Sequence, residues 1–384
     1  MRLFCAILMT AALVWAGLTG GTGHAAPSVK ADAAILMDAK TGEVLFAHNI
    51  HKRCPPASTT KIMTAILTIE SGRLDETAEI SLKAAGTGGS SMHLFAGQHI
   101  TLRELLTGLM LRSGNDAAVA LAQHLGGSES AFVSMMNAKA QSLGAVNSRF
   151  ANPHGLTAPN HYSTAFDLAW MARYALADAT FASIVSTRET SIDWFDRRGR
   201  EKDVNLRNTN KLLWMLEDAD GVKTGTTGDA GPCLVASATR GNQRLISVVL
   251  HDHSRWYDSM QLLKYGFDAF DLYEYADANQ SVGPLYVEKG IGEAVDMIIS
   301  QAAAVVVKPD DLPHVTVELD VPEKIKAPVF QGQKVGEVVF YVRGKAAKTV
   351  DVVAARDVAE WTYTGVFFDI LLNLFRVVAG WGLL

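Results

Sequence analysis

The chain has 384 residues, of which 48% are hydrophobic and 20% charged, and its formal net charge is −5. This length can bury a large core spread over two or three domains. The mild acidity gives no support for nucleic-acid binding, so we expect no nucleic-acid partner. Three cysteines are too few for a disulfide scaffold. We expect Cys54 and Cys233 to be free, partly buried thiols, and a bridge between them is the alternative.

Residues 1–25 have the composition of a secretory signal peptide. Arg2 gives the positive start, residues 3–18 are almost entirely apolar, and small residues lead to the expected cleavage point at Ala25. The alternative is an uncleaved N-terminal membrane helix. We predict that the mature chain is exported.

The next segments predict a β-hairpin and then a helix. Apolar runs at 33–38 and 44–47 flank a turn at 40–43, which is the hairpin pattern. After two prolines, the run Ser58-Thr59-Thr60 offers side chains that cap helices, and apolar residues at helical spacing extend to about Ser71.

Ser58 and Lys61 are one turn apart on this predicted helix and share a face. A serine hydroxyl becomes a good nucleophile only when a base removes its proton. Lysine is a base only when its amine is neutral, which burial, a helix N-terminus and a second cation all favour. At average composition, about one Ser-x-x-Lys is expected by chance in a chain of this length. The alternative at this point is therefore that Lys61 is a surface lysine that follows a helix start by chance.

Periodicity predicts the rest of an α+β domain over residues 26–276. Helical spacing occurs at 102–110, 117–125, 130–143, 164–177 and 259–270. Two short apolar runs, Leu234–Ala238 and Leu245–Leu250, are separated by a hairpin turn and predict strands. Strands at both ends with helices between them indicate a helical layer packed on a mostly antiparallel sheet.

The character of the chain changes after this domain. Residues 279–356 contain short alternating segments between glycines and prolines, which predicts a small all-β domain that serves as a spacer or docking platform. Residues 357–384 are strongly apolar, and Asp369 and Arg376 fall on one narrow helical stripe with small residues. A spanning helix would place both charges in hydrocarbon at about 2.5 to 3.5 kcal/mol each. We therefore expect an amphipathic helix at the membrane surface, with a spanning helix or a helix docked on the protein as alternatives.

Three motifs stand in order along the chain: Ser58-Thr59-Thr60-Lys61, Ser113-Gly114-Asn115 and Lys223-Thr224-Gly225. A second Lys-Thr-Gly, Lys40-Thr41-Gly42, lies in the predicted hairpin turn, and we exclude it by its order and context. Each motif is weak alone. Their order, spacing and context together make a specific signal.

With these motifs the chain resembles the penicillin-recognising serine enzymes, and within them the low-molecular-weight penicillin-binding proteins that are D-alanyl-D-alanine carboxypeptidases. The resemblance covers nearly the whole chain. It implies a penicillin-binding/β-lactamase-like transpeptidase domain, then the all-β domain and the amphipathic C-terminal helix. Three stretches support it: 152–156 (Asn-Pro-His-Gly-Leu), 207–214 and 220–226.

The resemblance also implies a role for each motif residue, with Ser58, Lys61 and Ser113 catalytic. Ser58 would attack the peptide bond between two D-alanines, Lys61 would be its base, and Ser113 would relay the proton to the leaving amine. The implied substrate-binding residues are Asn115, Lys223, Thr224, Gly225, Thr226 and Arg255. The backbone N–H groups of Ser58 and Thr226 would form the oxyanion hole. No cofactor and no metal is implied.

Other interpretations of the same residues remain open. A β-lactamase shares the acylation machinery, but its deacylating glutamate has only a near-match at Glu201–Asn205, just before the third motif. A D,D-endopeptidase would use the same residues, and a non-catalytic β-lactam sensor would retain the fold. We expect His154 to be structural and His251-Asp252-His253 to be a loop rather than a metal site.

The implied partners are peptidoglycan stem peptides ending in D-Ala-D-Ala, β-lactams as inhibitors, and a membrane surface contacted by the C-terminal helix. The implied location is the periplasm, at the outer face of the cytoplasmic membrane, with peripheral anchoring by that helix.

Overall fold

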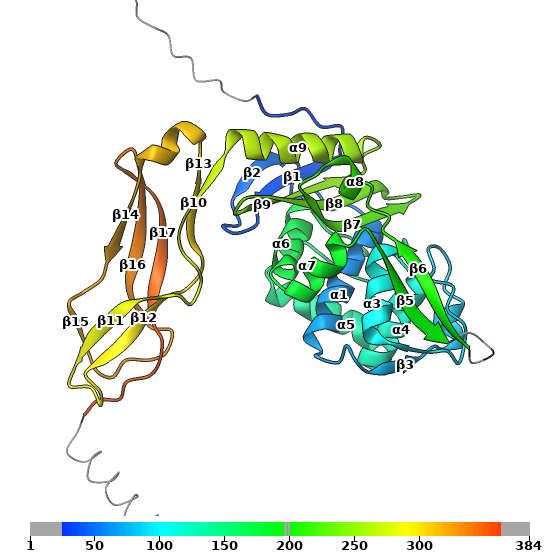
Figure 1. Cartoon of the computed structure of the whole chain (residues 1–384), viewed down its shortest axis with the longest axis horizontal. Coiled ribbons are helices and arrows are strands. Elements are labelled where there is room, and N and C mark those ends of the chain that lie inside the picture. Colours follow the sequence, from blue (N-terminus) through cyan, green and yellow to red (C-terminus); the bar gives the residue numbers. More distant parts are fainter. Residues whose placement is uncertain (1–24, 196–197, 199, 362–384) are drawn as a thin grey trace, which may run out of the picture.

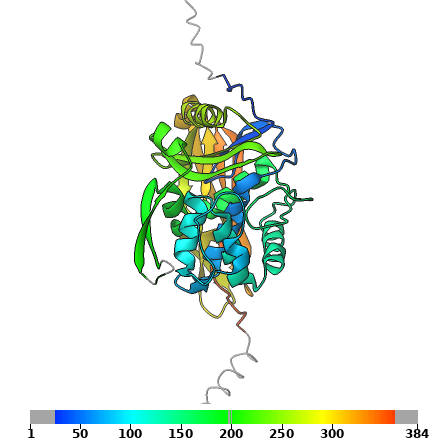
Figure 2. The same ribbon diagram turned by 90° about the vertical axis from the view of Figure 1, so that its right-hand side faces the viewer.

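A computed structural model describes residues 25–195, 198 and 200–361 of the chain. The predicted signal peptide, apart from Ala25, and the predicted terminal helix beyond Trp361 lie outside these residues. Within the described ranges, no helix is both long and apolar enough to cross a bilayer. Figures 1 and 2 show an α+β domain with a slender β domain beside it.

A five-stranded antiparallel sheet forms the centre of the first domain, where the sequence predicts a mostly antiparallel sheet. Its spatial order is β2-β1-β9-β8-β7, which leaves β7 at one edge. The strands are β1 (Ala33–Asp38), β2 (Val44–His48), β7 (Ala219–Thr227), β8 (Gly231–Arg240) and β9 (Gln243–Leu250). Alternate residues of these strands are buried on opposite faces, so both faces need cover.

Helices supply that cover on both faces (Figure 1). The larger layer contains α1 (Lys61–Glu70), α3 (Leu102–Leu111), α4 (Asn115–Gly126), α5 (Glu129–Ser142), α6 (Ala165–Leu176) and α7 (Ala179–Ser186). The short helix α2 (Leu82–Ala85) packs on α4. On the opposite face lie α8 (Leu212–Met215) and α9 (Arg255–Ala269). The predicted layer of helices on an antiparallel sheet is therefore confirmed.

The start of the first helix differs from the prediction. Residues Ala57–Thr60 form a separate 3₁₀ turn, η1, and α1 begins only at Lys61. Neither element has a side-chain cap, so the expectation that Ser58, Thr59 or Thr60 caps a helix is wrong. Their side chains are used otherwise: Thr59 Oγ1 donates to Pro56 O at 2.6 Å, and Thr60 Oγ1 lies 2.8 Å from His161 Nε2.

Two small sheets have no counterpart in the sequence analysis. They are the pair β3 (Thr77–Glu79) and β4 (His99–Thr101), and the long hairpin of β5 (Glu189–Phe195) and β6 (Glu201–Arg207). Both contain many polar residues, so they lack the apolar runs by which we recognised the other strands.

The second domain is all-β, as predicted. Its main sheet has the order β14-β16-β17-β12-β11-β15, and its strands are β11 (Ser281–Glu288), β12 (Ala294–Ile299), β14 (Val315–Asp320), β15 (Lys324–Lys326), β16 (Lys334–Val342) and β17 (Lys345–Ala354). A separate pair, β10 (Asp271–Ala276) and β13 (Ala303–Val307), lies beside it, followed by the 3₁₀ helix η2 (Pro309–His314). A second hydrophobic core fills this domain.

The boundaries of this domain extend beyond those we assigned. β10 pairs with β13, so the β domain begins near residue 271 rather than at 279. At the other end, Val358 is buried and pairs with Val329. Residues 357–361, which we grouped with the terminal helix, therefore pack on the β domain.

The two domains meet at the hairpin turn between β1 and β2. Lys40 Nζ lies 2.6 Å from Glu274 Oε1 and 2.7 Å from Asp277 Oδ1, both beyond the first domain. Arg173 holds the turn by donating to Ala39 O and Lys40 O at 2.7 and 2.9 Å. The excluded Lys-Thr-Gly thus lies at the domain junction.

Candidate active site

Ser58 lies in the strained turn η1, directly before α1. Ala57 has a φ of +48°, a conformation that is unfavourable for a residue with a side chain. Two glycines pack closely against the turn. A Cβ on Gly155 would lie 1.9 Å from Ala57 O, and a Cβ on Gly225 would lie 2.8 Å from Ser58 N. The close fit brings β7 and the loop at 155 directly against the turn that carries Ser58.

Lys61 is completely buried at the first position of α1. Its Nζ lies 3.1 Å from Ser58 Oγ, 2.7 Å from Asn115 Oδ1 and 2.7 Å from His154 O. The amide and backbone carbonyl oxygens can only accept hydrogen bonds. A neutral amine has two N–H groups, which these two oxygens occupy, so its lone pair is left to face the Ser58 hydroxyl.

The protonation of Lys61 follows from its surroundings. Burial holds the pKa of Lys61 well below its ordinary value, and the positive charge of Lys223 lowers it further. The carboxylate of Asp116 acts in the opposite direction. The balance favours an uncharged amine, which is the form that can accept a proton.

Ser113 and Asn115 come from the sharp connection between α3 and α4. Ser113 has a φ of +62° and is 6% exposed, and its Oγ has no hydrogen-bond partner within the described part of the chain. Asn115 Nδ2 donates to Gly88 O at 2.7 Å. This bond orients the amide so that its oxygen faces Lys61.

β7 supplies the third motif from the edge of the sheet. Lys223 is buried, and its Nζ donates to Thr224 O at 3.1 Å. Thr224 Oγ1 lies 3.0 Å from Thr209 Oγ1. Among the described strands, β7 pairs only with β8, so it forms an edge of the sheet.

Arg255 reaches β7 from the first position of α9. Its Nη1 donates to Gly225 O at 2.8 Å, to Thr226 Oγ1 at 2.9 Å and to Cys233 O at 3.2 Å. Burial and the charge of Arg255 lower the pKa of Lys223 to about 7. Above neutral pH Lys223 therefore loses its charge, whereas Arg255 beside β7 keeps its own. Hydrogen bonds connect Lys61 to Ser58 and Asn115, and connect Arg255 to Gly225 and Thr226. Ser113 precedes Asn115 by two residues in the same connection.

Two contributors to this cluster were not predicted from the sequence. His154 takes part through its carbonyl oxygen, which no motif can reveal because every residue has one. Its ring is buried, which lowers its pKa to about 3, and Nδ1 accepts from Leu156 N. Asp116 is fully buried and accepts from Ser91 Oγ at 2.6 Å and from Met92 N at 3.0 Å, which holds the loop above Asn115. A charged residue directly after Ser113-Gly114-Asn115 is the signal that could have identified it.

Other reactive groups lie outside the cluster. Cys54 and Cys233 are free and buried, and burial raises the pKa of Cys233 to about 11. His251 is largely exposed and lies 3.9 Å from Asp32. In the ranges that the structure describes, no three His, Cys, Asp or Glu side chains gather as metal ligands would.

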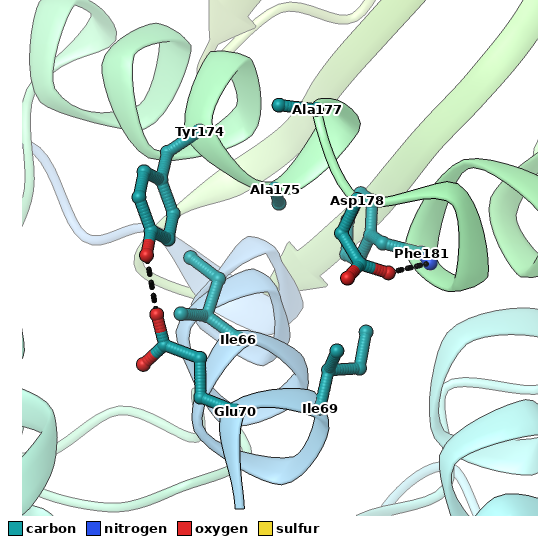
Figure 3. Close-up of a pocket in the computed structure, with 8 residues that line it drawn as sticks. All are labelled: Ile66, Ile69, Glu70, Tyr174, Ala175, Ala177, Asp178 and Phe181. Carbon is teal, nitrogen blue, oxygen red and sulfur yellow. Dashed lines mark hydrogen bonds between the residues drawn. The ribbon is translucent and has the colours of Figure 1, made fainter. Parts of the chain in front are cut away.

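A separate cavity of about 260 Å³ lies between α1, α6 and α7 (Figure 3). Its carboxylates are already engaged: Glu70 accepts from Tyr174 Oη at 2.5 Å, and Asp178 accepts from Phe181 N at 3.1 Å. Glu70 follows Lys61 by nine residues, or about 13 Å of helix. This cavity is therefore distinct from the Ser58 cluster.

The chain matches two known families. The family described as D-alanyl-D-alanine carboxypeptidase matches residues 21–254, and the C-terminal domain of penicillin-binding protein 5 matches residues 270–360. D-alanyl-D-alanine carboxypeptidase DacF of Bacillus subtilis (strain 168) is 36% identical over 340 residues, which cover 86% of each chain. D-alanyl-D-alanine carboxypeptidase DacC of Escherichia coli (strain K12) is 32% identical over 368 residues, 91% of this chain and 90% of that protein.

The similarity extends to solved structures. Penicillin binding protein 5 from Haemophilus influenzae superposes with a TM-score of 0.74 at 31% identity, over 88% of this chain and 100% of that one. The matched residues include both domains and the whole Ser58 cluster apart from Arg255, which lies one residue beyond the first family match. The chain belongs to the D-alanyl-D-alanine carboxypeptidase family.

Proposed function

We propose that this enzyme removes the terminal D-alanine from peptidoglycan stem peptides ending in D-Ala-D-Ala, and that β-lactams acylate the same serine. Membership of the family supports the reaction and the substrate class. The position of one buried amine supports the assignment of the site.

In the proposed reaction, Lys61 accepts the hydroxyl proton of Ser58 while Oγ attacks the carbonyl carbon of the penultimate D-alanine. The Oγ–C bond forms, the peptide C–N bond breaks, and Ser113 passes the proton to the departing amine. The backbone N–H groups of Ser58 and Thr226 bind the oxyanion, where losing one donor costs about 3 to 4 kcal/mol in related chemistry. Water then hydrolyses the acyl-serine, which releases the shortened peptide and restores Ser58.

Substrate binding divides between the two walls of the cluster. We assign the peptide amide to Asn115 and the edge of β7, at Gly225 and Thr226. The terminal carboxylate is assigned to Lys223, Thr224 and Arg255, where the Arg255 cation, joined by the Lys223 cation below a pH of about 7, lies close to a hydroxyl group.

The contacts of Lys61 Nζ carry this proposal. Two carbonyl-type acceptors at 2.7 Å occupy its N–H groups, and Ser58 Oγ lies 3.1 Å away. An ammonium ion would gain from those acceptors too, but burial and the charge of Lys223 oppose that form. The arrangement therefore suits Lys61 as the base that accepts the hydroxyl proton of Ser58.

The test is covalent labelling by penicillin, followed by intact-protein mass, together with release of D-alanine from an acyl-D-Ala-D-Ala peptide. Ser58→Ala is expected to abolish both the adduct and peptide cleavage. Lys61→Ala should lower the acylation rate by at least about a hundredfold, in line with the contribution of a general base. A full penicillin adduct on Ser58→Ala would refute the assignment of the nucleophile.

The time course of the adduct separates this proposal from a β-lactamase. A carboxypeptidase should retain the penicillin adduct for many catalytic cycles of peptide cleavage, whereas a β-lactamase would lose it quickly. The near-match at Glu201–Asn205 gives no support to the β-lactamase, because these residues pair with β5 in the long hairpin.

We also propose that the enzyme acts in the periplasm and is held at the outer face of the cytoplasmic membrane by residues 362–384. The support is the apolar sequence of this segment and the cell-wall chemistry of the family. The vesicle experiment described below includes a variant that tests this anchoring by itself.

A further inference from the structure

We propose that the end of the β domain from which the chain leaves is a second membrane-contact surface, which places apolar side chains in the lipid interface. This surface is named the distal tip and consists of residues 286–293, 324–331 and 356–361. The inference rests on the membrane anchoring proposed above and adds to it a contact made by the folded domain.

Three large apolar side chains are exposed at the distal tip, each from a different segment. The exposed fractions are 46% for Ile291, 62% for Phe330 and 44% for Trp361, and Tyr286 nearby is 52% exposed. A single exposed apolar residue is ordinary, but several gathered at one end of a domain mark an interaction surface.

Hydrogen bonds hold the three segments together. Ile291 N donates to Ala359 O at 2.8 Å, and Trp361 N donates to Lys289 O at 2.6 Å. Beneath them, the buried residues Val329 and Val358 pair across the second and third segments. The exposed side chains of Ile291 and Phe330 therefore stand on an ordered base.

The position of the distal tip points to lipid as the partner. Figures 1 and 2 show the chain leaving the β domain at the end opposite α9. Trp361 is followed directly by the apolar sequence of residues 362–384. If that segment lies in the membrane surface, residue 361 and its neighbours are at the level of the lipid headgroups.

The chemistry of the distal tip fits an interface rather than a charged surface. Tryptophan and tyrosine are enriched at headgroup level, and lysine side chains can extend from there to water. The charges are mixed, with cations at Lys289, Lys324, Lys326 and Arg356 and anions at Glu288, Glu293, Asp357 and Glu360. Since the four positive and four negative charges cancel, the attraction should be apolar and only weakly dependent on salt.

The experiment measures binding of the full chain to vesicles of phosphatidylethanolamine and phosphatidylglycerol at low and high salt. The tip variant is Ile291→Ser/Phe330→Ser, and the matched control is Leu82→Ser, a residue that is 83% exposed on the first domain. A tail variant, Phe368→Asp/Leu372→Asp, reports on anchoring alone. Cleavage of a soluble peptide should be the same for all four proteins, because none of these changes touches the Ser58 cluster.

The inference predicts that the tip variant binds vesicles at least about tenfold more weakly than the wild type, at either salt concentration, while Leu82→Ser binds equally well. If the tail variant loses binding and the tip variant keeps it, anchoring stands and the distal tip is refuted. If the tip variant loses binding and the tail variant keeps it, the distal tip stands and the anchoring proposal fails. If the wild type does not bind vesicles, both the anchoring proposal and the distal tip are refuted.

Hydrogen exchange in the wild type provides an independent measurement should the tip variant fold poorly. Vesicles should slow exchange in residues 289–293 and 328–331 and leave the turn at 241–242 unchanged. Unchanged exchange at the tip refutes the inference. Concentration-dependent dimerisation that the tip variant abolishes would assign the surface to a second copy of the chain and refute it as well.

Discussion

At the scale of single residues, the chemistry depends on where the two hydrogens of one amine point. Asn115 is the key orienting residue, because its Nδ2 donates to Gly88 O while its Oδ1 accepts from Lys61, each at 2.7 Å. The carbonyl of His154 takes the second hydrogen. An amide oxygen has only a partial charge, so it fixes the amine without forcing it to become an ammonium ion.

This reasoning predicts the effect of Asn115→Asp. A carboxylate 2.7 Å from Lys61 Nζ favours the ammonium form, so it should raise the pKa of Lys61. At pH 7 more of the amine is then protonated, and acylation by penicillin should fall by at least about tenfold. The loss should shrink as the pH is raised through the new pKa.

The pH dependence of the acylation rate checks this prediction. Asn115→Ala is the control, since it also removes the amide but adds no charge, and its loss should not be reversed at high pH. If the acylation rate of Asn115→Asp falls at low pH with the same apparent pKa as that of the wild type, the electrostatic role of the amide is contradicted.

Most of these residues were predictable because their side chains carry the chemistry. Ser58, Lys61, Ser113 and Lys223 fall in motifs whose residue types and order are informative. The His154 carbonyl was not predictable, because a backbone oxygen acquires a role only through the path of its loop. The lowered pKa of Lys223 was likewise hidden, since it depends on burial and on Arg255 from a distant helix.

At the scale of elements, the site depends on how closely neighbouring segments approach the turn that carries Ser58. Gly155 is the tightest point, because its φ is +91° and a Cβ would meet Ala57 O at 1.9 Å. Gly155→Ala should therefore separate the loop from the turn, with a loss of more than about 3 kcal/mol in the free energy of unfolding. Acylation by penicillin should fall with it.

Gly144→Ala is the matched control for this change. Gly144 has a similar φ of +79°, but no atom lies within 4 Å of a Cβ there. The free energy of unfolding of Gly144→Ala should fall by only about 1 to 2 kcal/mol, which is the cost of a positive φ for a residue with a side chain. Acylation by penicillin should be retained. If chemical denaturation shows equal losses in the free energy of unfolding for Gly155→Ala and Gly144→Ala, the role of the close approach between the loop at Gly155 and the turn is contradicted.

The elements divide clearly into those that periodicity reveals and those it does not. α3 to α6, β8 and β9 were predicted because one face or one run of each is apolar. The hairpin β5–β6 was missed because its strands alternate mainly among polar residues such as Glu189, Asn205 and Arg207, and its structure depends on pairing rather than on burial. The 3₁₀ turn at Ser58 was taken for the first turn of a helix, since both place positions three apart on one side.

At the scale of the whole molecule, two copies of one tripeptide serve different purposes. Lys223 lies buried in the Ser58 cluster, whereas Lys40 forms partly exposed ion pairs with Glu274 and Asp277 across the domain junction. Burial and position distinguish them, and the residues themselves do not. The order of motifs along the chain was the sequence feature that separated the two.

Lys40→Ala should leave kcat/KM on a soluble peptide within about twofold and change the free energy of unfolding by less than about 1 kcal/mol, as expected for partly exposed pairs. Lys223→Ala should lower kcat/KM by at least about tenfold, because the substrate carboxylate loses a nearby cation. Steady-state kinetics and urea denaturation of both variants make the comparison. A larger catalytic loss for Lys40→Ala than for Lys223→Ala would reverse the assignment.

The free edge of β7 has a consequence for selectivity. A linear peptide in an extended conformation can pair with that edge as a sixth strand, and main-chain pairing of this kind is largely indifferent to side chains. We therefore expect the enzyme to tolerate changes in the third residue of the stem peptide. N-methylation of the paired amide should weaken binding more than any side-chain exchange, which inhibition constants of matched peptide analogues would show.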